Sequence, residues 1–74
     1  MLKLSDLKLN EKGRIILVAQ SSLKRRLNDL GFIEDEEVEC ILVSPDGGFK
    51  AYKICESVIA LRSEDGQKIM IERI

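Results

Sequence analysis

The stretch Ser22-Leu-Lys-Arg-Arg-Leu-Asn-Asp-Leu-Gly31-Phe32 has the pattern of an amphipathic helix and lies between segments that have strand patterns. Leu23, Leu27 and Leu30 recur at helical spacing on one face, and the positions between them are mostly charged or polar. A serine at position 21 or 22 can cap the helix, and Gly31 can end it in a left-handed conformation. We therefore expect one short helix packed through its leucines, with a basic outer face that is either solvated or used by a partner.

Five other segments are rich in the apolar and β-branched residues that strands favour. They cover residues 13–20, 38–44, 49–55, 58–62 and 67–73. The turn signal Ser44-Pro-Asp-Gly-Gly48 predicts that the third of these strands runs back antiparallel to the second. The Asp-Gly pair within residues 63–66 predicts another hairpin. Spaced leucines in residues 4–9, with Ser5 as a cap, predict a short helical turn that closes one end of the core.

About five short strands, with one short helix after the first, predict a mainly β fold that curls into a small partly open barrel. Period-two alternation assigns one set of strand residues to the interior, together with the leucines of the helix. This interior set is Ile15, Leu17, Leu23, Leu27, Leu30, Val38, Cys40, Leu42, Tyr52, Ile54, Ile59, Leu61, Ile69 and Ile71. The opposite faces receive Ile16, Val18, Ile41, Val43 and Met70. An apolar outer face is covered either by the ends of the chain or by another molecule.

The composition narrows the possible classes of function. With 74 residues, 45% of them hydrophobic, we expect a single domain over residues 1–74. Twelve basic and thirteen acidic residues give a net charge of −1, so no overall field attracts nucleic acid or an anionic membrane. No apolar run reaches the roughly eighteen residues of a membrane span, and the first residues lack a signal-peptide pattern. We expect a cytoplasmic protein that neither binds nucleic acid nor inserts into a membrane.

The sequence offers little catalytic or metal-binding chemistry. It contains no histidine, which is the usual general base and a common metal ligand. Cys40 and Cys55 form no CxxC pair and have no partner base, so we expect core or surface thiols. The four consecutive acids of residues 34–37 lack the alternating oxygen ligands of a calcium loop, and we expect a solvated turn. A binding or regulatory module is therefore predicted rather than an enzyme, with no cofactor, no catalytic residue and no metal site.

Two blocks of sequence resemble a known family. The first is Arg26-Leu27-Asn-Asp-Leu30-Gly31-Phe32, and the second is Ile59-Ala60-Leu61-Arg62. Further matching residues extend over nearly the whole chain, namely Leu4-Ser-Asp-Leu7, Gly13, Val38, Pro45, Ile69 and Ile71. The chain resembles the ferrous iron transport protein A (FeoA) domain. This resemblance implies an SH3-like barrel with an inserted helix, similar in fold to the C-terminal domain of DtxR-type metal-dependent repressors.

The resemblance also implies a function. FeoA proteins are expected to be cytosolic, non-catalytic accessory proteins that act beside the FeoB membrane permease in bacterial uptake of Fe²⁺. We expect this chain to bind the cytoplasmic domain of a FeoB-type permease. The partner-binding residues predicted for it are Arg25 and Arg26 on the helix, with Gly31 and Phe32 in the turn that follows.

Two alternatives and two departures from the family pattern remain. The chain could be a stand-alone SH3-like module that regulates a transcriptional repressor or another soluble partner, and its near-neutral charge disfavours an RNA-contacting barrel. A homodimer would also agree with an exposed strand edge or an apolar outer face.

Asp35 and Glu56 stand where the family has glycine, so either those turns differ here or the chain is a divergent member.

Overall fold

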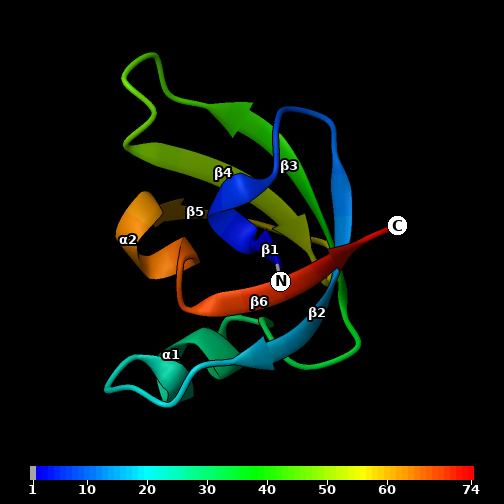
Figure 1. Ribbon diagram of the computed structural model, residues 1–74, viewed down its shortest axis with the longest axis vertical. Helices are drawn as coiled ribbons and strands as arrows, with labels where there is room; N and C mark the ends of the chain where they lie inside the picture. The colour runs from blue at the N-terminus through cyan, green and yellow to red at the C-terminus, as the bar shows by residue number, and fades with distance from the viewer. Residues whose placement is uncertain (1) are drawn as a thin grey trace.

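The computed structural model describes residues 2–74, which form six strands and three short helical segments. In chain order these are β1 (Leu2–Lys3), η1 (Leu4–Asp6), β2 (Lys12–Val18), α1 (Lys24–Asp29), β3 (Glu37–Val43), β4 (Phe49–Ile54), β5 (Ser57–Arg62), α2 (Ser63–Gly66) and β6 (Ile69–Arg73). The strands form one antiparallel sheet in the order β1-β6-β2-β3-β4-β5. Figure 1 shows this sheet curling around η1, with α1 at one end of the molecule. The predicted mainly β, partly open architecture is confirmed, with one short strand more than expected.

Helix α1 is shorter than the amphipathic pattern that predicted it. The residues before it form a turn, in which the Lys24 N–H donates to the Ser21 carbonyl at 3.2 Å. The Ser21 hydroxyl accepts a further bond from the Leu23 N–H at 3.2 Å, within the turn before the helix. The predicted serine cap is nevertheless wrong, because the N-cap is Leu23 and no side chain caps the helix. Gly31 ends the helix with φ of 113°, a value that glycine adopts without strain. The helix and its glycine stop are therefore confirmed.

Two β-bulges change which side chains face the core. Between Ile15 and Leu17 the pairing of β2 with β6 gains one residue, and the same happens in β3 between Cys40 and Leu42. An extra residue reverses the side-chain alternation beyond it. The predictions that Leu17 and Leu42 are interior are consequently wrong, since these side chains are 45% and 56% exposed. The same reversal explains Val18, which was predicted to face outward but is buried.

Most of the remaining predicted interior forms the core. The buried members of that set are Ile15, Leu27, Val38, Cys40, Tyr52, Ile54, Leu61, Ile69 and Ile71. Leu23 and Ile59 are half-buried and pack against this core, whereas Leu30 is exposed at the end of the helix. The core also contains Phe32 and two leucines from the N-terminal segment, Leu4 and Leu7, which are fully buried. The helical turn predicted to close one end of the core is thus confirmed as η1, but its predicted cap is wrong: Ser5 lies inside η1, and the N-cap is Lys3, whose N–H donates to Asp6 Oδ2 at 2.9 Å.

The N-terminal segment is held against β4 by hydrogen bonds to its carbonyl groups. The Lys50 ammonium donates to the carbonyl oxygens of Ser5 and Leu7, at 2.7 Å each. The Tyr52 hydroxyl donates to the Leu4 carbonyl at 3.4 Å, and burial raises the pKa of this phenol. The Leu4 carbonyl also accepts from the Leu7 N–H at 3.1 Å, at the end of η1. For the Ser5 and Leu7 carbonyls of this three-residue helix and its end, the partner is the Lys50 ammonium.

The predicted hairpin at residues 63–66 is wrong. These residues form the short helix α2, and β6 pairs with β1 and β2 instead of with β5. The Ser63 N–H and hydroxyl donate to the carbonyls of Gly48 and Gly47, at 3.0 Å and 2.7 Å, which directs the chain away from β5. Gly66 packs closely on Ser5, whose Cβ and N atoms would lie 3.3 Å from an added Cβ. These long-range contacts, rather than the local Asp-Gly signal, determine how the chain runs from β5 to β6.

Asp35 and Glu56, which stand where the resembled family has glycine, both have a left-handed backbone. Asp35 has φ of 74°, and Glu56 has φ of 65° next to Cys55 at 50°. Cys55 and Glu56 join β4 to β5 in a two-residue connection whose positive φ values are those of a type I′ turn. Each of the two positions therefore has the backbone conformation that favours glycine, with the strain of a side chain at positive φ.

Replacing Glu56 by glycine should stabilise the protein. Glycine removes the steric cost of positive φ, offset in part by its greater freedom in the unfolded chain, for a net gain of about 0.5–1 kcal/mol. For a domain of this size, that gain raises the melting temperature by several degrees. Thermal and urea unfolding of Glu56→Gly measure the effect, and Glu56→Ala is the matched control because it loses the carboxylate but keeps Cβ. Equal stability of the two variants would contradict the account.

Replacing Lys50 by methionine should weaken the hold on the N-terminal segment. The variant keeps an unbranched side chain but leaves the Ser5 and Leu7 carbonyls without their charged donor, at a cost of about 2–3 kcal/mol in free energy of unfolding. Urea unfolding measures this loss. Lys53→Met, on the exposed face of the same strand, should change stability by less than about 0.5 kcal/mol. Similar losses in both variants would show that the ammonium contacts are not specific.

Candidate groove between the helix and the sheet edge

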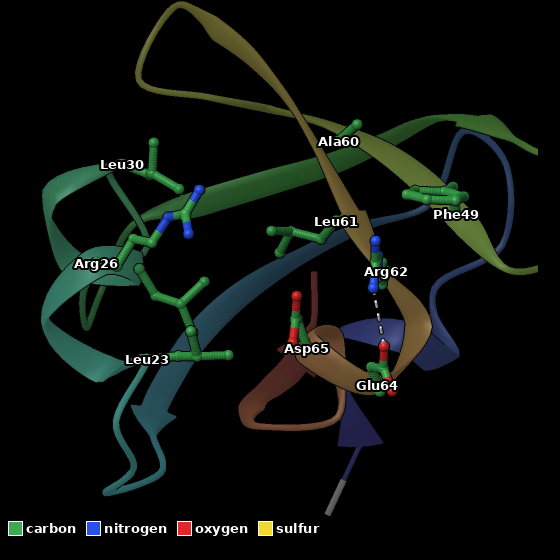
Figure 2. A pocket seen from close by; sticks show the side chains of 10 residues that line it. Leu23, Arg26, Leu30, Phe49, Ala60, Leu61, Arg62, Glu64 and Asp65 are labelled. Atoms are coloured by element: carbon green, nitrogen blue, oxygen red, sulfur yellow. Dashed lines mark ion pairs between the residues drawn. The ribbon is translucent and has the colours of Figure 1, made fainter.

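A groove of about 390 Å³ separates helix α1 from strand β5. Figure 2 shows the helix supplying one wall and the strand, with α2 beyond it, supplying the other. The lining residues are Leu23, Arg26, Leu27, Leu30, Phe49, Ala60, Leu61, Arg62, Glu64 and Asp65. Leucine side chains from the helix and Leu61 from the strand give the groove an apolar floor, and the charged residues lie around it (Figure 2).

The end of α1 fixes the helical wall. The Phe32 N–H donates to the Leu27 carbonyl at 3.0 Å, and the Gly31 N–H donates to the Asn28 carbonyl at 3.0 Å. This pair of bonds, with positive φ at Gly31, is the Schellman arrangement of a helix C-terminus. The Phe32 ring then packs edge-on against Tyr52, with ring centroids 6.4 Å apart. The helix is thereby attached to the core at its last turn.

Charges at the groove differ between its two walls. On the sheet side, the Arg62 guanidinium lies 3.8 Å from Glu64 Oε1 and 5.8 Å from the centre of the Phe49 ring. On the helix side, Arg26 is exposed and forms no ion pair with any of residues 2–74. Arg25 is likewise exposed and free of ion pairs within that range. The helical wall is therefore a positively charged surface available to an acidic group.

The four residues predicted to bind a partner have different environments. Arg25 and Arg26 are exposed on α1, and Arg26 lines the groove. Gly31 is half-buried, with its carbonyl 3.8 Å from Cys55 Sγ. Phe32 is fully buried, so it can act on the site only by positioning the helix and not by touching a partner.

Sequence reasoning missed the sheet side of the groove. Phe49 is 48% exposed although it begins a strand, and Ala60 is exposed on β5. The sequence signal for this side of the groove was Phe49 itself, an aromatic residue directly after the 44–48 turn. The position of β5 at the edge of the sheet could not be predicted, because it depends on β6 pairing elsewhere.

The acidic loop and Cys55 form a second feature, next to the end of α1. Glu34, Asp35 and Glu37 are exposed, in line with a solvated turn. The Cys55 thiol donates to Glu36 Oε2 at 3.5 Å. The pKa of this thiol is raised, mainly by partial desolvation and to a lesser extent by the Glu36 carboxylate. Cys40 is buried in β3 with its thiol free, and burial raises its pKa.

The structure also bears on metal and membrane binding. Within residues 2–74, no three side chains of the metal-binding types come together at one place. None of the helices in this part of the chain has the length and apolar character needed to cross a membrane.

Comparison with protein-family models matches residues 2–73 to the FeoA domain. No match is found among curated proteins. The sequence blocks that suggested this family, around residues 26–32 and 59–62, lie on the two walls of the groove and on the turn between helix and core.

Solved structures of FeoA proteins share the fold. Iron(II) transport protein A from Clostridium thermocellum is 32% identical, with a TM-score of 0.91 over 99% of this chain and 46% of that one. FeoA from Stenotrophomonas maltophilia, solved with zinc and described as a prokaryotic SH3 domain protein, is 26% identical, with a TM-score of 0.86 over 97% of this chain and 91% of that one. The SH3-like expectation is thereby confirmed.

A manganese-dependent transcriptional repressor is also similar in structure. Its TM-score is 0.84 at 17% identity, over 99% of this chain and 36% of the repressor. At this identity the likeness concerns the fold alone. It agrees with the expected similarity between the FeoA barrel and a repressor domain.

The environment of Cys55 predicts how this thiol reacts. Since the Glu36 carboxylate disfavours the thiolate, Glu36→Gln should increase the rate at which iodoacetamide alkylates Cys55 at a fixed, mildly alkaline pH. Mass spectrometry over time measures modification at each cysteine, and Cys40 should stay unmodified while the protein is folded. Glu37→Gln is the matched control, as this carboxylate makes no contact with the thiol. An unchanged rate in Glu36→Gln would refute the assignment.

Proposed function

This chain belongs to the FeoA family, and we propose that it is a non-catalytic accessory protein of bacterial ferrous iron uptake that binds and modulates a FeoB-type permease. The observation that carries the proposal is the match to the FeoA domain over residues 2–73. Relatives that share its fold include an iron(II) transport protein A. A cytoplasmic location follows as part of the proposal, because the permease domain to be bound lies in the cytoplasm.

The groove between α1 and β5 is the surface we propose for this contact. It combines apolar side chains with charged residues at its margin, which is the usual anatomy of a protein–protein interface. Aromatic residues and arginine are enriched in protein–protein interfaces, and the groove offers both in Phe49 and Arg62, which form a cation–π contact. The groove is a better candidate for protein contact than for catalysis, because the chain has no histidine and the groove contains no cysteine.

We propose that the basic face of α1 orients the partner and raises the rate at which it associates. Arg25 and Arg26 are exposed and unpaired within residues 2–74, so they can meet carboxylates of a partner without losing an existing contact. Charges at the rim of an interface act mainly on association and on its salt dependence. Gly31 and Phe32 support this surface from below by fixing the last turn of the helix.

The alternative, a module that regulates a transcriptional repressor, has less support. Its structural basis is a fold likeness to manganese-dependent repressors at 17% and 15% identity. The same fold serves unrelated functions in different proteins. A chain that fails to bind the permease domain but is retained by a repressor would favour this alternative.

Reversing two charges on α1 should weaken binding to the soluble cytoplasmic domain of the cognate permease. Arg25→Glu with Arg26→Glu should raise the dissociation constant by about tenfold, equivalent to about 1.4 kcal/mol, with a smaller effect at high salt. Isothermal titration calorimetry, with and without guanine nucleotide, measures both.

A matched control reverses two positive charges at the start of β2 and in the segment before it. Lys8→Glu with Lys12→Glu alters two exposed lysines that do not line the groove. This variant should bind like the wild type. If both double variants lose affinity equally, the effect is one of net charge and the helix is not the contact surface. Unchanged affinity in the arginine variant would also contradict its placement there.

A further inference from the structure

Strand β5 has one edge without a partner strand. It is the last strand in the order β1-β6-β2-β3-β4-β5 and pairs with β4 alone. In the two-residue hairpin at Cys55–Glu56, Ile54 and Ser57 form the hydrogen-bonded pair next to the turn. Hydrogen-bonded pairs then alternate along the strands, so Ile59 and Leu61 direct their backbone groups toward β4. The N–H and C=O groups of the intervening residues point to the free edge.

The residues that face the free edge are Val58, Ala60 and Arg62. No turn or loop hydrogen bond within residues 2–74 involves the backbone of Val58 or Ala60, and none involves the Arg62 N–H. The Arg62 carbonyl, by contrast, belongs to the first turn of α2, since Arg62 is the N-cap of that helix. Proteins commonly protect such an edge with lysine, proline, a bulge or a covering segment. Here the six-residue strand is unbroken in its pairing with β4, contains neither lysine nor proline, and exposes Val58 at 61%. The only charge on this strand is Arg62 at its end.

Helix α1 lies across the groove from this edge instead of covering it. The space of about 390 Å³ separates Ala60 and Leu61 from the leucines of the helix (Figure 2). A chain that enters here meets open backbone groups on one side and apolar side chains on the other. The outward face of the sheet is continuous with this edge. It carries two further exposed apolar side chains, Phe49 at 48% and Leu42 at 56%.

The charges indicate what kind of chain would fit. Lys24, Arg25 and Arg26 follow one another on α1 and have no ion pair within residues 2–74. On the opposite wall, Glu64 is already paired with Arg62, and Asp65 is the remaining acid. An entering segment therefore gains most from a carboxylate on the helix side and from apolar side chains over the floor.

We propose that the free edge of β5 binds an extended segment of the partner as an additional strand, with apolar side chains against the leucines of α1 and a carboxylate beside Arg26. This inference rests on the proposed function, since it specifies how the permease would be held. Binding of this kind derives affinity from main-chain hydrogen bonds and specificity from alternate side chains. It places the partner between α1 and β5 and extends the sheet by one strand.

Amide hydrogen exchange tests this directly. The ¹⁵N-labelled chain is measured alone and with the soluble cytoplasmic domain of the permease at a saturating concentration. Strand addition predicts that the amides of Val58, Ala60 and Arg62 exchange at least tenfold more slowly in the complex. The amides of Ile59 and Leu61 serve as internal controls, because they already donate to β4 and should change little.

A variant tests the same contact by affinity. Ala60→Pro removes the central outward N–H, and proline is tolerated at the free edge of a strand. It should weaken binding at least tenfold, whereas Ala60→Val keeps the N–H and should bind like the wild type. Circular dichroism checks that the proline variant folds, and if it does not, the exchange pattern of the unmodified chain decides.

The outcomes separate the two proposals. Saturable binding without slower exchange at the three outward amides would overturn strand addition and leave the proposed function intact. Absence of any binding to the permease domain would overturn both. Slower exchange in the chain alone at high concentration, accompanied by dimers in sedimentation, would assign the edge to a second copy of the chain and overturn the proposal.

Discussion

The buried ring of Phe32 is the contact on which the rest of the structure depends. Directly after the helix, Gly31 turns the chain at positive φ and Phe32 enters the core, where its ring meets Tyr52. Truncating such a ring to alanine typically costs about 3–5 kcal/mol. Tyr52 in turn bonds to the carbonyl of Leu4, so one aromatic pair joins the helix, the sheet and the N-terminal segment. Together with Leu27, which is buried in the core, and Leu23, which packs against it, this attachment fixes where α1 lies beside the groove.

Local preference and tertiary structure disagree at several turns, and tertiary structure prevails. Glu56 adopts a backbone angle that suits glycine, because β4 and β5 on either side of it are held in register. Asp35 does so in the loop between α1 and β3, where its N–H donates to the Ile15 carbonyl of β2 at 2.8 Å. The Asp-Gly signal near residue 65 is likewise overridden, since the Ser63 contacts and the insertion of β1 beside β6 leave no hairpin there. Strain of this kind persists only where the surrounding structure determines the conformation.

The sequence predicted the elements better than it predicted their neighbours. Apolar periodicity identified α1, five strands and the N-terminal turn, because each of these depends on residues close together in the chain. It failed at Leu17, Leu42 and Val18, because a bulge of one residue reverses every later side chain and has no strong local signal. The candidate site was predicted only on its helical wall, through Arg25 and Arg26. Ala60 and Phe49 join it because β5 lies at the sheet edge, a property of the whole topology.

The central claim is that the groove between α1 and β5 is where this FeoA protein meets its permease. The most direct test is a nuclear magnetic resonance titration of the ¹⁵N-labelled chain with the soluble cytoplasmic domain of the cognate permease. The account predicts saturable shift changes that concentrate on α1, on β5 and on Phe49, with little change in the 44–48 loop or at Lys12. Saturable changes centred on that loop or on β1, with α1 and β5 unaffected, would contradict it.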